Sequence, residues 1–265
     1  MTEISAIVFS DLDGTLLDHH SYDYSPALPA LRKLAQLGVP VILASSKTAA
    51  EIAPLRKELG LSEHPAIVEN GAGLLPPGAD PDTDNSAYTH LRAALGQLPN
   101  DLTQFYTGFG DMTAQQVADH TGLPLPQAEL AKTRLYSEPG IWSGTPEQQA
   151  AFESALTAMG VSHRFGGRYL TLSFGRTKAD QIEAIRAQYN ASTIIALGDA
   201  PNDLEMLAAA DHPILITNPK AKPLSGLTPA LSARLTRSTL PGPAGWNETV
   251  SALLTKLLKD HPKGT

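Results

Sequence analysis

Cysteine is absent from this chain of 265 residues, and its absence excludes disulfide bonds and thiolate metal sites. A bound metal ion would need oxygen or histidine ligands, which favours a hard cation. No apolar run approaches the roughly 20 residues of a membrane-spanning helix, and the chain does not open on a basic segment followed by a long apolar one. We therefore expect a cytoplasmic protein.

Positive charge is also scarce. The chain has 20 Lys and Arg residues against 27 Asp and Glu, and its formal net charge at pH 7 is −7. No lysine and arginine cluster is interleaved with aromatic residues, which make up only 6% of the chain. Because such a chain has no basic field to attract a polyanion, we expect neither nucleic acid nor a membrane as a partner. The oligomeric state stays unknown.

What the chain does contain is an alternation of short apolar runs and amphipathic stretches. Apolar runs at 6–10, 39–46 and 65–70 alternate with amphipathic stretches at 25–38 and 47–60. Runs this continuous predict strands that are buried on both faces, as in a parallel sheet covered by helices. The predicted fold class is α/β, with a doubly wound, Rossmann-like parallel sheet.

The alternation is interrupted and then resumes towards the C-terminus. Residues 74–86, rich in Pro and Gly, predict a linker, and residues 170–178 predict the return of the chain. Between them the predicted helices do not alternate with buried parallel strands. We therefore predict a catalytic core of residues 1–80 and 172–265, with an inserted α+β domain at residues 81–171.

Two aspartates, Asp11 and Asp13, stand directly after the first predicted strand and are followed by Gly14 and Thr15. Alternate residues of an extended segment share a side, so the two carboxylates converge. One carboxylate can attack phosphorus as a nucleophile, and the other can protonate the leaving oxygen. Their mutual repulsion indicates that a cation lies between them. A pair of turn or helix-capping aspartates is the less favoured interpretation.

Other polar residues follow predicted strands at the edge where doubly wound sheets bind ligands. Ser45 closes a strand, and Ser46 and Lys47 open the next helix, whose free N–H groups suit a phosphate oxygen. Lys178 begins the stretch after the insert and could neutralise both a nucleophile and a phosphoryl group. Alone, each has an ordinary explanation as a helix cap or a solvated lysine. Their shared location favours a functional site.

The stretch "ALGDAPNDLEML", residues 196–207, completes the set. Asp199 ends a predicted strand, and Asn202 and Asp203 lie in the loop that opens a helix. Asp199 supplies the further carboxylate that an octahedral Mg²⁺ site needs beside Asp11, with water at the remaining positions. A polar turn is the alternative explanation, but such a turn would have to recur independently at each strand end.

In chain order, "DLDGT", a strand-ending serine, an isolated lysine and "GDAPND" resemble the four motifs of the haloacid dehalogenase-like phosphohydrolases. The resemblance covers both outer parts of the chain. It implies that Asp11 is a nucleophile that forms an aspartyl-phosphate and that Asp13 is the general acid and then base. It also implies that Ser45 and Lys178 hold the transferring phosphoryl group.

The same resemblance implies a Mg²⁺ cofactor. The ligands would be Asp11, the backbone carbonyl group of Asp13 and Asp199, with Asp203 supporting the site through water. An aspartate rather than a threonine at position 13 favours phosphatase or mutase chemistry over that of the transport ATPases in the superfamily, because it can discharge the intermediate.

The large insert lies between Ser45 and Lys178, a placement that marks a type 2 cap in this superfamily. Such a cap excludes water and contacts the leaving group. Stretches from core, insert and tail, including "VILASSKTAAEI", "FGDMTAQQVADHTGLP" and "GPAGWNE", resemble the mannosyl-3-phosphoglycerate phosphatases. The implied reaction is hydrolysis of mannosyl-3-phosphoglycerate, a small phosphorylated glycoside, to phosphate and the compatible solute mannosylglycerate. Glucosyl-3-phosphoglycerate could be a substrate as well.

A substrate with a carboxylate, a phosphate and a hexose needs cationic and hydrogen-bonding partners. The predicted substrate-binding residues are Ser46, Lys47, Asn70 and Asn202 outside the insert and Thr113, Arg134, Glu138 and Arg168 within it. A purely structural role for the insert residues is an equal alternative. Three other functions stay open: a phosphomannomutase-type isomerase, another sugar-phosphate phosphatase with the same cap, and a non-catalytic module that binds a phosphorylated metabolite.

Overall fold

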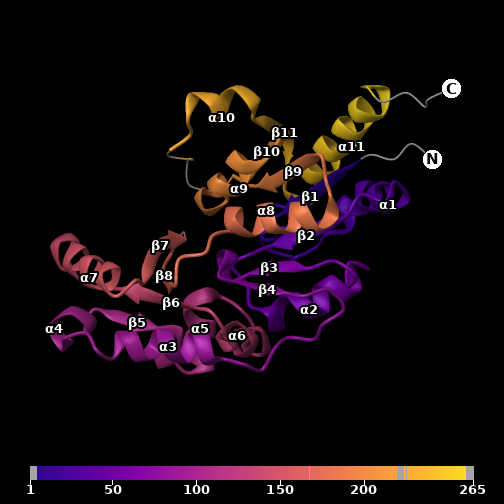
Figure 1. Cartoon of the computed structure of the whole chain (residues 1–265). Coiled ribbons are helices and arrows are strands. Elements are labelled where there is room, and N and C mark those ends of the chain that lie inside the picture. Colours follow the sequence, from indigo (N-terminus) through magenta and orange to yellow (C-terminus); the bar gives the residue numbers. More distant parts are fainter. Residues whose placement is uncertain (1–4, 167, 220–223, 225, 261–265) are drawn as a thin grey trace. The chain divides into compact units, whose positions relative to one another are not determined.

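The computed structural model describes residues 5–166, 168–219, 224 and 226–260 (Figure 1). The chain divides into two compact units by its contacts. Unit 1 comprises Met1–Ser45 and Lys178–Thr265, and unit 2 comprises Ser46–Thr177. The domain boundaries expected from the sequence, at residues 80 and 172, rest on changes of composition along the chain, whereas these units rest on contacts between residues. The expected boundaries stay a prediction.

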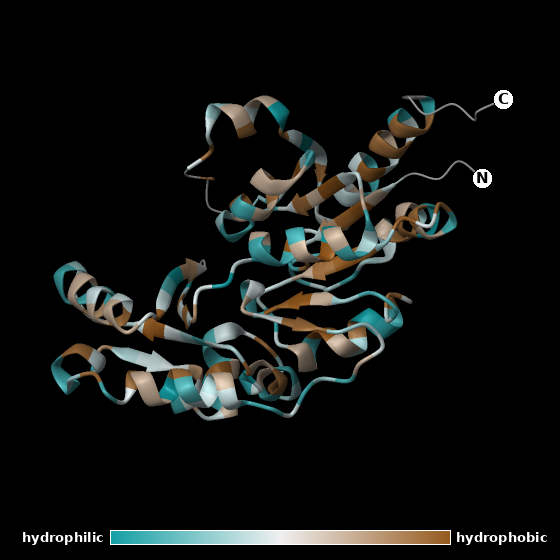
Figure 2. Cartoon of the chain, in the orientation of Figure 1, coloured by the Kyte–Doolittle hydropathy of each residue, from teal (hydrophilic) through white to brown (hydrophobic). Residues whose placement is uncertain are grey.

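Unit 1 contains a parallel sheet with the strand order β11-β10-β9-β1-β2. Its strands are β1 (Ala6–Ser10), β2 (Val41–Ala44), β9 (Thr193–Gly198), β10 (His212–Thr217) and β11 (Thr236–Pro241). Every residue of β1 and β2 is buried, and Figure 2 shows both strands as apolar. Continuous apolar strands of this kind need cover on both faces, so the predicted α/β class with a parallel sheet is confirmed.

Helices of unit 1 pack against this sheet in two groups. They are η1 (Ser25–Ala27), α1 (Leu28–Gln36), α8 (Lys178–Tyr189), η4 (Pro201–Asp203), α9 (Leu204–Ala209), α10 (Pro229–Arg234) and α11 (Gly242–Asp260). Helix α8 contacts α9 and β1, whereas α11 contacts α1, β10 and β11. Within the described part of the chain, none of the helices has both the length and the apolar character that crossing a membrane requires.

The C-terminal helix is tied to the strand that precedes Asp11. Trp246 of α11 is fully buried, and its Nε1–H group donates a hydrogen bond of 2.9 Å to Ser10 Oγ. The Ser10 hydroxyl in turn donates to the backbone carbonyl oxygen of Asp11 at 2.8 Å. Because a buried indole N–H group needs a partner, this chain of bonds fixes both the helix and the end of β1.

Unit 2 combines helices with antiparallel strands. Its elements are α2 (Ala49–Glu58), β3 (Ala66–Val68), η2 (Glu69–Gly71), β4 (Gly73–Leu75), α3 (Ser86–Leu95), α4 (Asn100–Thr103), β5 (Tyr106–Gly108), η3 (Phe109–Asp111), α5 (Ala114–Thr121), α6 (Leu125–Lys132), β6 (Ser137–Trp142), α7 (Pro146–Ala158), β7 (Ser162–Gly166) and β8 (Tyr169–Ser173). Strands β5-β6-β8-β7 form an antiparallel sheet in that order, and β3 and β4 form a hairpin. The predicted α+β character of the insert is confirmed.

Alternation of side chains explains why helices cover the sheet of unit 2. In β8, Leu170 and Leu172 are buried while the residues between and beside them are only half-buried. The two leucines pack against Phe152 and Leu156 of α7 and against Leu91 of α3. This period of two is typical of an antiparallel strand and differs from the continuous apolar runs of β1 and β2.

Candidate active site

The strands β1, β2 and β9 end at the same level of the unit 1 sheet. In the register of the sheet, Ser10 stands opposite both Leu43 and Leu197. The next residue, Asp11, donates its backbone N–H group to the Leu197 carbonyl oxygen at 2.9 Å. The structure therefore places Asp11, Asp199 and the buried Ser45 at the carboxyl edge of the sheet, where α/β folds bind ligands.

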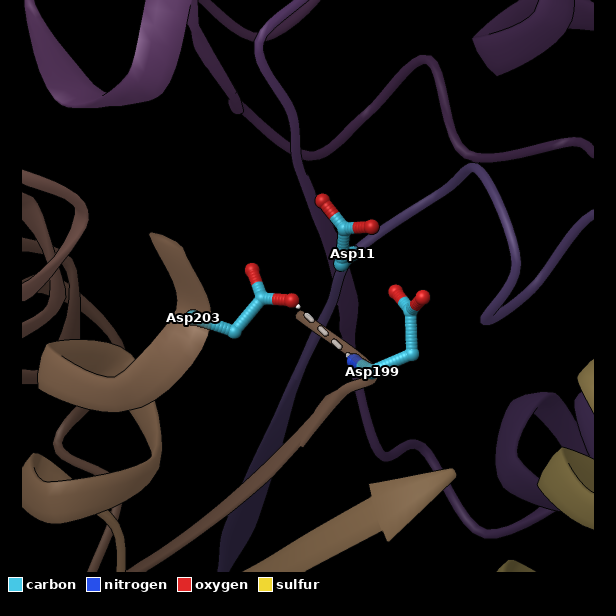
Figure 3. Close-up of side chains that lie close together, drawn as sticks. All are labelled: Asp11, Asp199 and Asp203. Carbon is cyan, nitrogen blue, oxygen red and sulfur yellow. Dashed lines mark hydrogen bonds between the residues drawn. The ribbon is translucent and has the colours of Figure 1, made fainter. Parts of the chain in front are cut away.

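Three carboxylates meet at this edge. One oxygen each of Asp11, Asp199 and Asp203 lies within 4.8 Å of the others, and the three residues are only 6%, 5% and 0% exposed (Figure 3). The second oxygen of Asp203 accepts hydrogen bonds from the backbone N–H groups of Asp199 at 3.1 Å and Ala200 at 3.2 Å. Asp203 therefore closes the loop after β9 while its carboxylate faces the other two.

The ammonium group of Lys178, the first residue of α8, lies against these carboxylates. Its Nζ atom lies 2.7 Å from Asp11 Oδ1 and 2.7 Å from Asp203 Oδ1, and the side chain is 1% exposed. Burial by itself lowers the pKa of Lys178, but the two carboxylates raise it above its ordinary value of 10.5. Lys178 therefore stays positively charged between them.

Negative charge nevertheless exceeds positive charge in this cluster, since three carboxylates face one ammonium group. Burial first, and then the charge of Asp203, raise the pKa of Asp11 well above its ordinary value of 3.8, although Lys178 opposes the rise. Burial and Asp203 likewise raise the pKa of Asp199 to about 6. A hard divalent cation would relieve this repulsion, and the donor set, oxygen only, fits one.

Two residues that the sequence analysis did not assign lie against Asp199. Asn218 donates from Nδ2 to Asp199 Oδ2 at 2.6 Å, and Thr15 donates from Oγ1 to Asp199 Oδ1 at 3.0 Å. Asn218 directly follows β10, so it has the same feature, a polar residue after a buried strand, that identified Asp11 and Asp199. That feature could have identified Asn218 from the sequence.

The remaining candidates of unit 1 lie in short loops. Asp13 is half-buried in a turn that is closed by a hydrogen bond of 2.9 Å from the Gly14 N–H group to the Leu17 carbonyl oxygen. Asn202 is half-buried in η4, directly before Asp203. Their catalytic and substrate-binding roles stay predictions.

Known proteins share both the sequence pattern and the fold. Residues 8–88 and 149–223, more than half of the chain, match the family model of the haloacid dehalogenase-like hydrolases. The chain belongs to this family. A curated relative, the glucosyl-3-phosphoglycerate/mannosyl-3-phosphoglycerate phosphatase of Methanococcoides burtonii, is 33% identical over 94% of this chain and 97% of its own length. The predicted membership in this family and the predicted class of phosphoric monoester hydrolase are therefore confirmed.

Solved structures with low sequence identity share the fold. A phosphatase of the haloalkanoate (HAD) enzyme superfamily from Bacteroides thetaiotaomicron has a TM-score of 0.65 at 18% identity, over 96% of this chain and 95% of that one. The sucrose-phosphatase of a Synechocystis species has a TM-score of 0.58 at 15% identity, over 94% of this chain and 98% of that one. At these identities the likeness shows the fold of this haloacid dehalogenase-like hydrolase and nothing of its substrate.

The raised pKa of Asp199 predicts how the metal-free enzyme responds to pH. Its value of about 6, against the ordinary 3.8, means that the folded protein holds a proton that the unfolded chain has already released. The free energy of unfolding should therefore fall as pH rises from about 4 to about 6, by roughly 2 kcal/mol from this group alone. Urea unfolding in EDTA at both pH values measures the change.

Asp199→Asn is the control for this pH dependence. The variant lacks the titrating group. Its free energy of unfolding should therefore fall less than that of the wild type over the same rise in pH. Saturating Mg²⁺ should abolish the wild-type contribution, because bound cation stabilises the ionised carboxylate. Equal pH slopes for wild type and variant in EDTA would contradict the assigned pKa.

In unit 2, Ser46 and Lys47 precede α2, and hydrogen bonds to their backbone carbonyl groups hold this segment in place. The Ser46 carbonyl oxygen accepts a hydrogen bond of 2.9 Å from Arg134 Nη1, and the Lys47 carbonyl oxygen accepts one of 2.9 Å from the Glu69 N–H group. Arg134 is 9% exposed and also donates from Nε to the Ala131 carbonyl oxygen at 2.8 Å. Arg134 thus has a structural role towards Ser46, and its contact with substrate stays a prediction.

Asn70 lies in a left-handed turn with its neighbours. The φ angles are 49° for Glu69, 59° for Asn70 and 99° for Gly71, and asparagine tolerates this region better than most residues. The Glu69 carboxylate is buried and accepts hydrogen bonds from the N–H groups of Leu135 at 2.9 Å and Ser137 at 2.8 Å. These bonds fix the turn that carries Asn70, whose predicted substrate contact is untested.

Glu138 is fully buried in a network of unit 2. Its carboxylate accepts hydrogen bonds from the Tyr88 hydroxyl at 2.6 Å, Arg92 Nη1 at 2.9 Å and the Gly110 N–H group at 3.1 Å. Arg92 also binds Asp111 through two further contacts. Donors already surround the Glu138 carboxylate, so it holds η3 in place, and a role in substrate binding stays only a prediction.

The last two candidates of unit 2 are exposed and make local contacts. Thr113 is the N-cap of α5, where its hydroxyl accepts the Gln116 N–H group at 3.2 Å. Arg168 donates to the carbonyl oxygens of His120 and Thr121, both at 3.2 Å, at the other end of that helix. The structure therefore brings both residues to α5 but does not test whether they contact substrate.

Proposed function

We propose that this protein hydrolyses mannosyl-3-phosphoglycerate to mannosylglycerate and phosphate, and that it also accepts glucosyl-3-phosphoglycerate. The observation that carries the proposal is the cluster of Asp11, Lys178, Asp199 and Asp203 in a chain 33% identical to a curated phosphatase of those two compounds. The family model leaves residues 89–148 unmatched, whereas a likeness over 94% of the chain includes most of them. The likeness therefore extends into the insert that we expect to recognise substrate.

The reaction would proceed in two displacements at phosphorus. The Asp11 carboxylate attacks the phosphorus atom, the bond to the ester oxygen breaks, and Asp13 gives a proton to that oxygen. A water molecule then attacks the phosphorus atom of the aspartyl-phosphate, Asp13 accepts its proton, and the bond between the Asp11 oxygen and phosphorus breaks. Phosphate leaves and both aspartates return to their starting states. Ser45 and Lys178 would bind the phosphoryl oxygens throughout.

The carboxylate cluster would hold Mg²⁺. Asp11, Asp199 and the backbone carbonyl group of Asp13 are the proposed ligands, and Asp203 supports them through water and through its bonds to the loop after β9. The chemistry that a bound cation would supply is neutralisation of the charge on the phosphoryl oxygens and on the attacking carboxylate. It would also lower the raised pKa of Asp11, which the reaction needs in its ionised form.

Phosphate release from a set of esters tests the proposal. Mannosyl-3-phosphoglycerate and glucosyl-3-phosphoglycerate are compared with mannose 6-phosphate and 3-phosphoglycerate, each with Mg²⁺ and with EDTA and without a bisphosphate activator. We expect metal-dependent release with kcat/KM at least about tenfold higher for the two glycosylated phosphoglycerates. Equal or faster hydrolysis of mannose 6-phosphate would refute the substrate assignment while leaving the phosphatase class intact. Activity that requires a bisphosphate and releases little phosphate would indicate a mutase.

A further inference from the structure

The Asp199 carboxylate is held at both oxygens by neutral donors from two distant parts of unit 1. Asn218 Nδ2 lies 2.6 Å from Oδ2, and Thr15 Oγ1 lies 3.0 Å from Oδ1. Thr15 is fully buried, and the bond joins residues 184 positions apart in the chain. Since a carboxylate has about four acceptor positions, both bonds leave lone pairs for a cation.

Gly14 completes the surroundings of this carboxylate. Its φ angle is +83°, and a Cβ atom there would lie 2.6 Å from Asn218 Nδ2 and 2.8 Å from Asp199 Oδ2. The turn is closed by hydrogen bonds from Gly14 N–H to the Leu17 carbonyl oxygen at 2.9 Å and from Thr15 N–H to the Leu12 carbonyl oxygen at 3.1 Å. Backbone, amide and carboxylate are thus packed without room for another side chain, so this turn positions Thr15 and confines Asn218.

We propose that Asn218 and Thr15 are positioning residues that set the rotation of the Asp199 carboxylate for divalent cation binding. The proposal rests on the cofactor role assigned to the carboxylate cluster. Because one donor binds each oxygen, the two hydrogen bonds fix the carboxylate in one orientation. Both donors are uncharged, so neither competes with the cation. Without them, Asp199 would rotate away from Asp11 and Asp203 to reduce the repulsion. Partners that orient metal ligands are typically worth about 10- to 100-fold in metal affinity.

Calorimetric titration of Mg²⁺ into EDTA-treated, dialysed enzyme, with no substrate present, tests this role. Asn218→Ala and Thr15→Val should each raise the dissociation constant of Mg²⁺ at least about tenfold. Thr15→Ser is the matched control, because it keeps the hydroxyl donor, and its dissociation constant should stay close to the wild-type value. Raising the Mg²⁺ concentration should restore kcat of Asn218→Ala, which an altered fold would not allow.

Asn218 is only half-buried, so Asn218→Ala leaves no closed cavity and is expected to fold, which circular dichroism checks. Unchanged Mg²⁺ affinity in both Asn218→Ala and Thr15→Val would overturn the proposal. A wild-type enzyme that binds no Mg²⁺ would overturn both the cofactor assignment and this role. A third outcome is that the wild type binds Mg²⁺, the variants bind it more weakly, and the wild type hydrolyses neither glycosylated phosphoglycerate. This outcome would refute only the proposed substrate.

Discussion

Asp11→Asn is expected to lower kcat for the best phosphate ester by at least about a thousandfold, because an amide is a poor nucleophile towards phosphorus. The fold should persist, since asparagine has nearly the same shape and Lys178 keeps its bond of 2.7 Å to Asp203. Substrate should still bind. Rapid-quench kinetics and mass spectrometry of the quenched protein measure turnover and the phosphoenzyme, which should form in the wild type and not in the variant.

Asp18→Asn is the matched control for this experiment. Asp18 lies seven residues further along the chain in unit 1, and its Oδ1 atom accepts the N–H groups of His20 at 3.0 Å and Ser21 at 2.9 Å. An asparagine oxygen can accept the same bonds, so turnover should stay near that of the wild type. A fully active Asp11→Asn enzyme, or a phosphoenzyme that forms without Asp11, would refute the covalent mechanism.

Lys178→Met is expected to have the largest effect on stability. The ammonium group is buried between Asp11 and Asp203, at 2.7 Å from each, and its removal leaves three carboxylates without that counter-charge. Loss of one partner of a buried ion pair typically costs about 3–5 kcal/mol, so the free energy of unfolding at pH 7 in EDTA should fall by about that amount. Urea unfolding measures the loss.

Two conditions should reduce the loss in Lys178→Met. Saturating Mg²⁺ should restore part of the stability by supplying positive charge, and a pH below the raised pKa values of Asp11 and Asp199 should do so by neutralising the carboxylates. Lys33→Met, an exposed lysine of α1, is the control and should change stability by less than about 0.5 kcal/mol. An unchanged stability of Lys178→Met in EDTA would show that Lys178 does not balance the cluster.

Predictions of the fold class succeeded because burial on both faces is visible in the sequence itself. The runs that became β1 and β2 are buried at every position and apolar at all of them except Ser10, a pattern typical of strands in a sheet that helices cover on both sides. The antiparallel sheet of unit 2 has weaker local signals. Its strand β8 alternates buried and half-buried residues, a pattern that fits several topologies. One of its two neighbours in the sheet, β6, is separated from it along the chain by α7 and β7.

The roles of individual side chains are less visible in the sequence than the fold class is. The position of a polar residue after a buried strand identified Asp11 and Asp199, and the structure brings their carboxylates together with that of Asp203. The chemical type of Arg134 and Glu138 suggested contact with substrate, but the structure binds Arg134 to the Ser46 backbone and surrounds Glu138 with internal donors. A residue type does not reveal whether its polar atoms already have partners inside the protein.

The sequence by itself determined the α/β class, the absence of thiolate ligands from any metal site and the residues that follow the strands, because these depend on composition and on neighbours in the chain. Tertiary structure alone decided which of those residues meet. Lys178 and Asp11 are 167 positions apart, yet packing of α8 against the sheet brings them within 2.7 Å. The raised pKa values of Asp11 and Asp199, and the two donors on Asp199, follow from such contacts, because burial and proximity are properties of the folded chain.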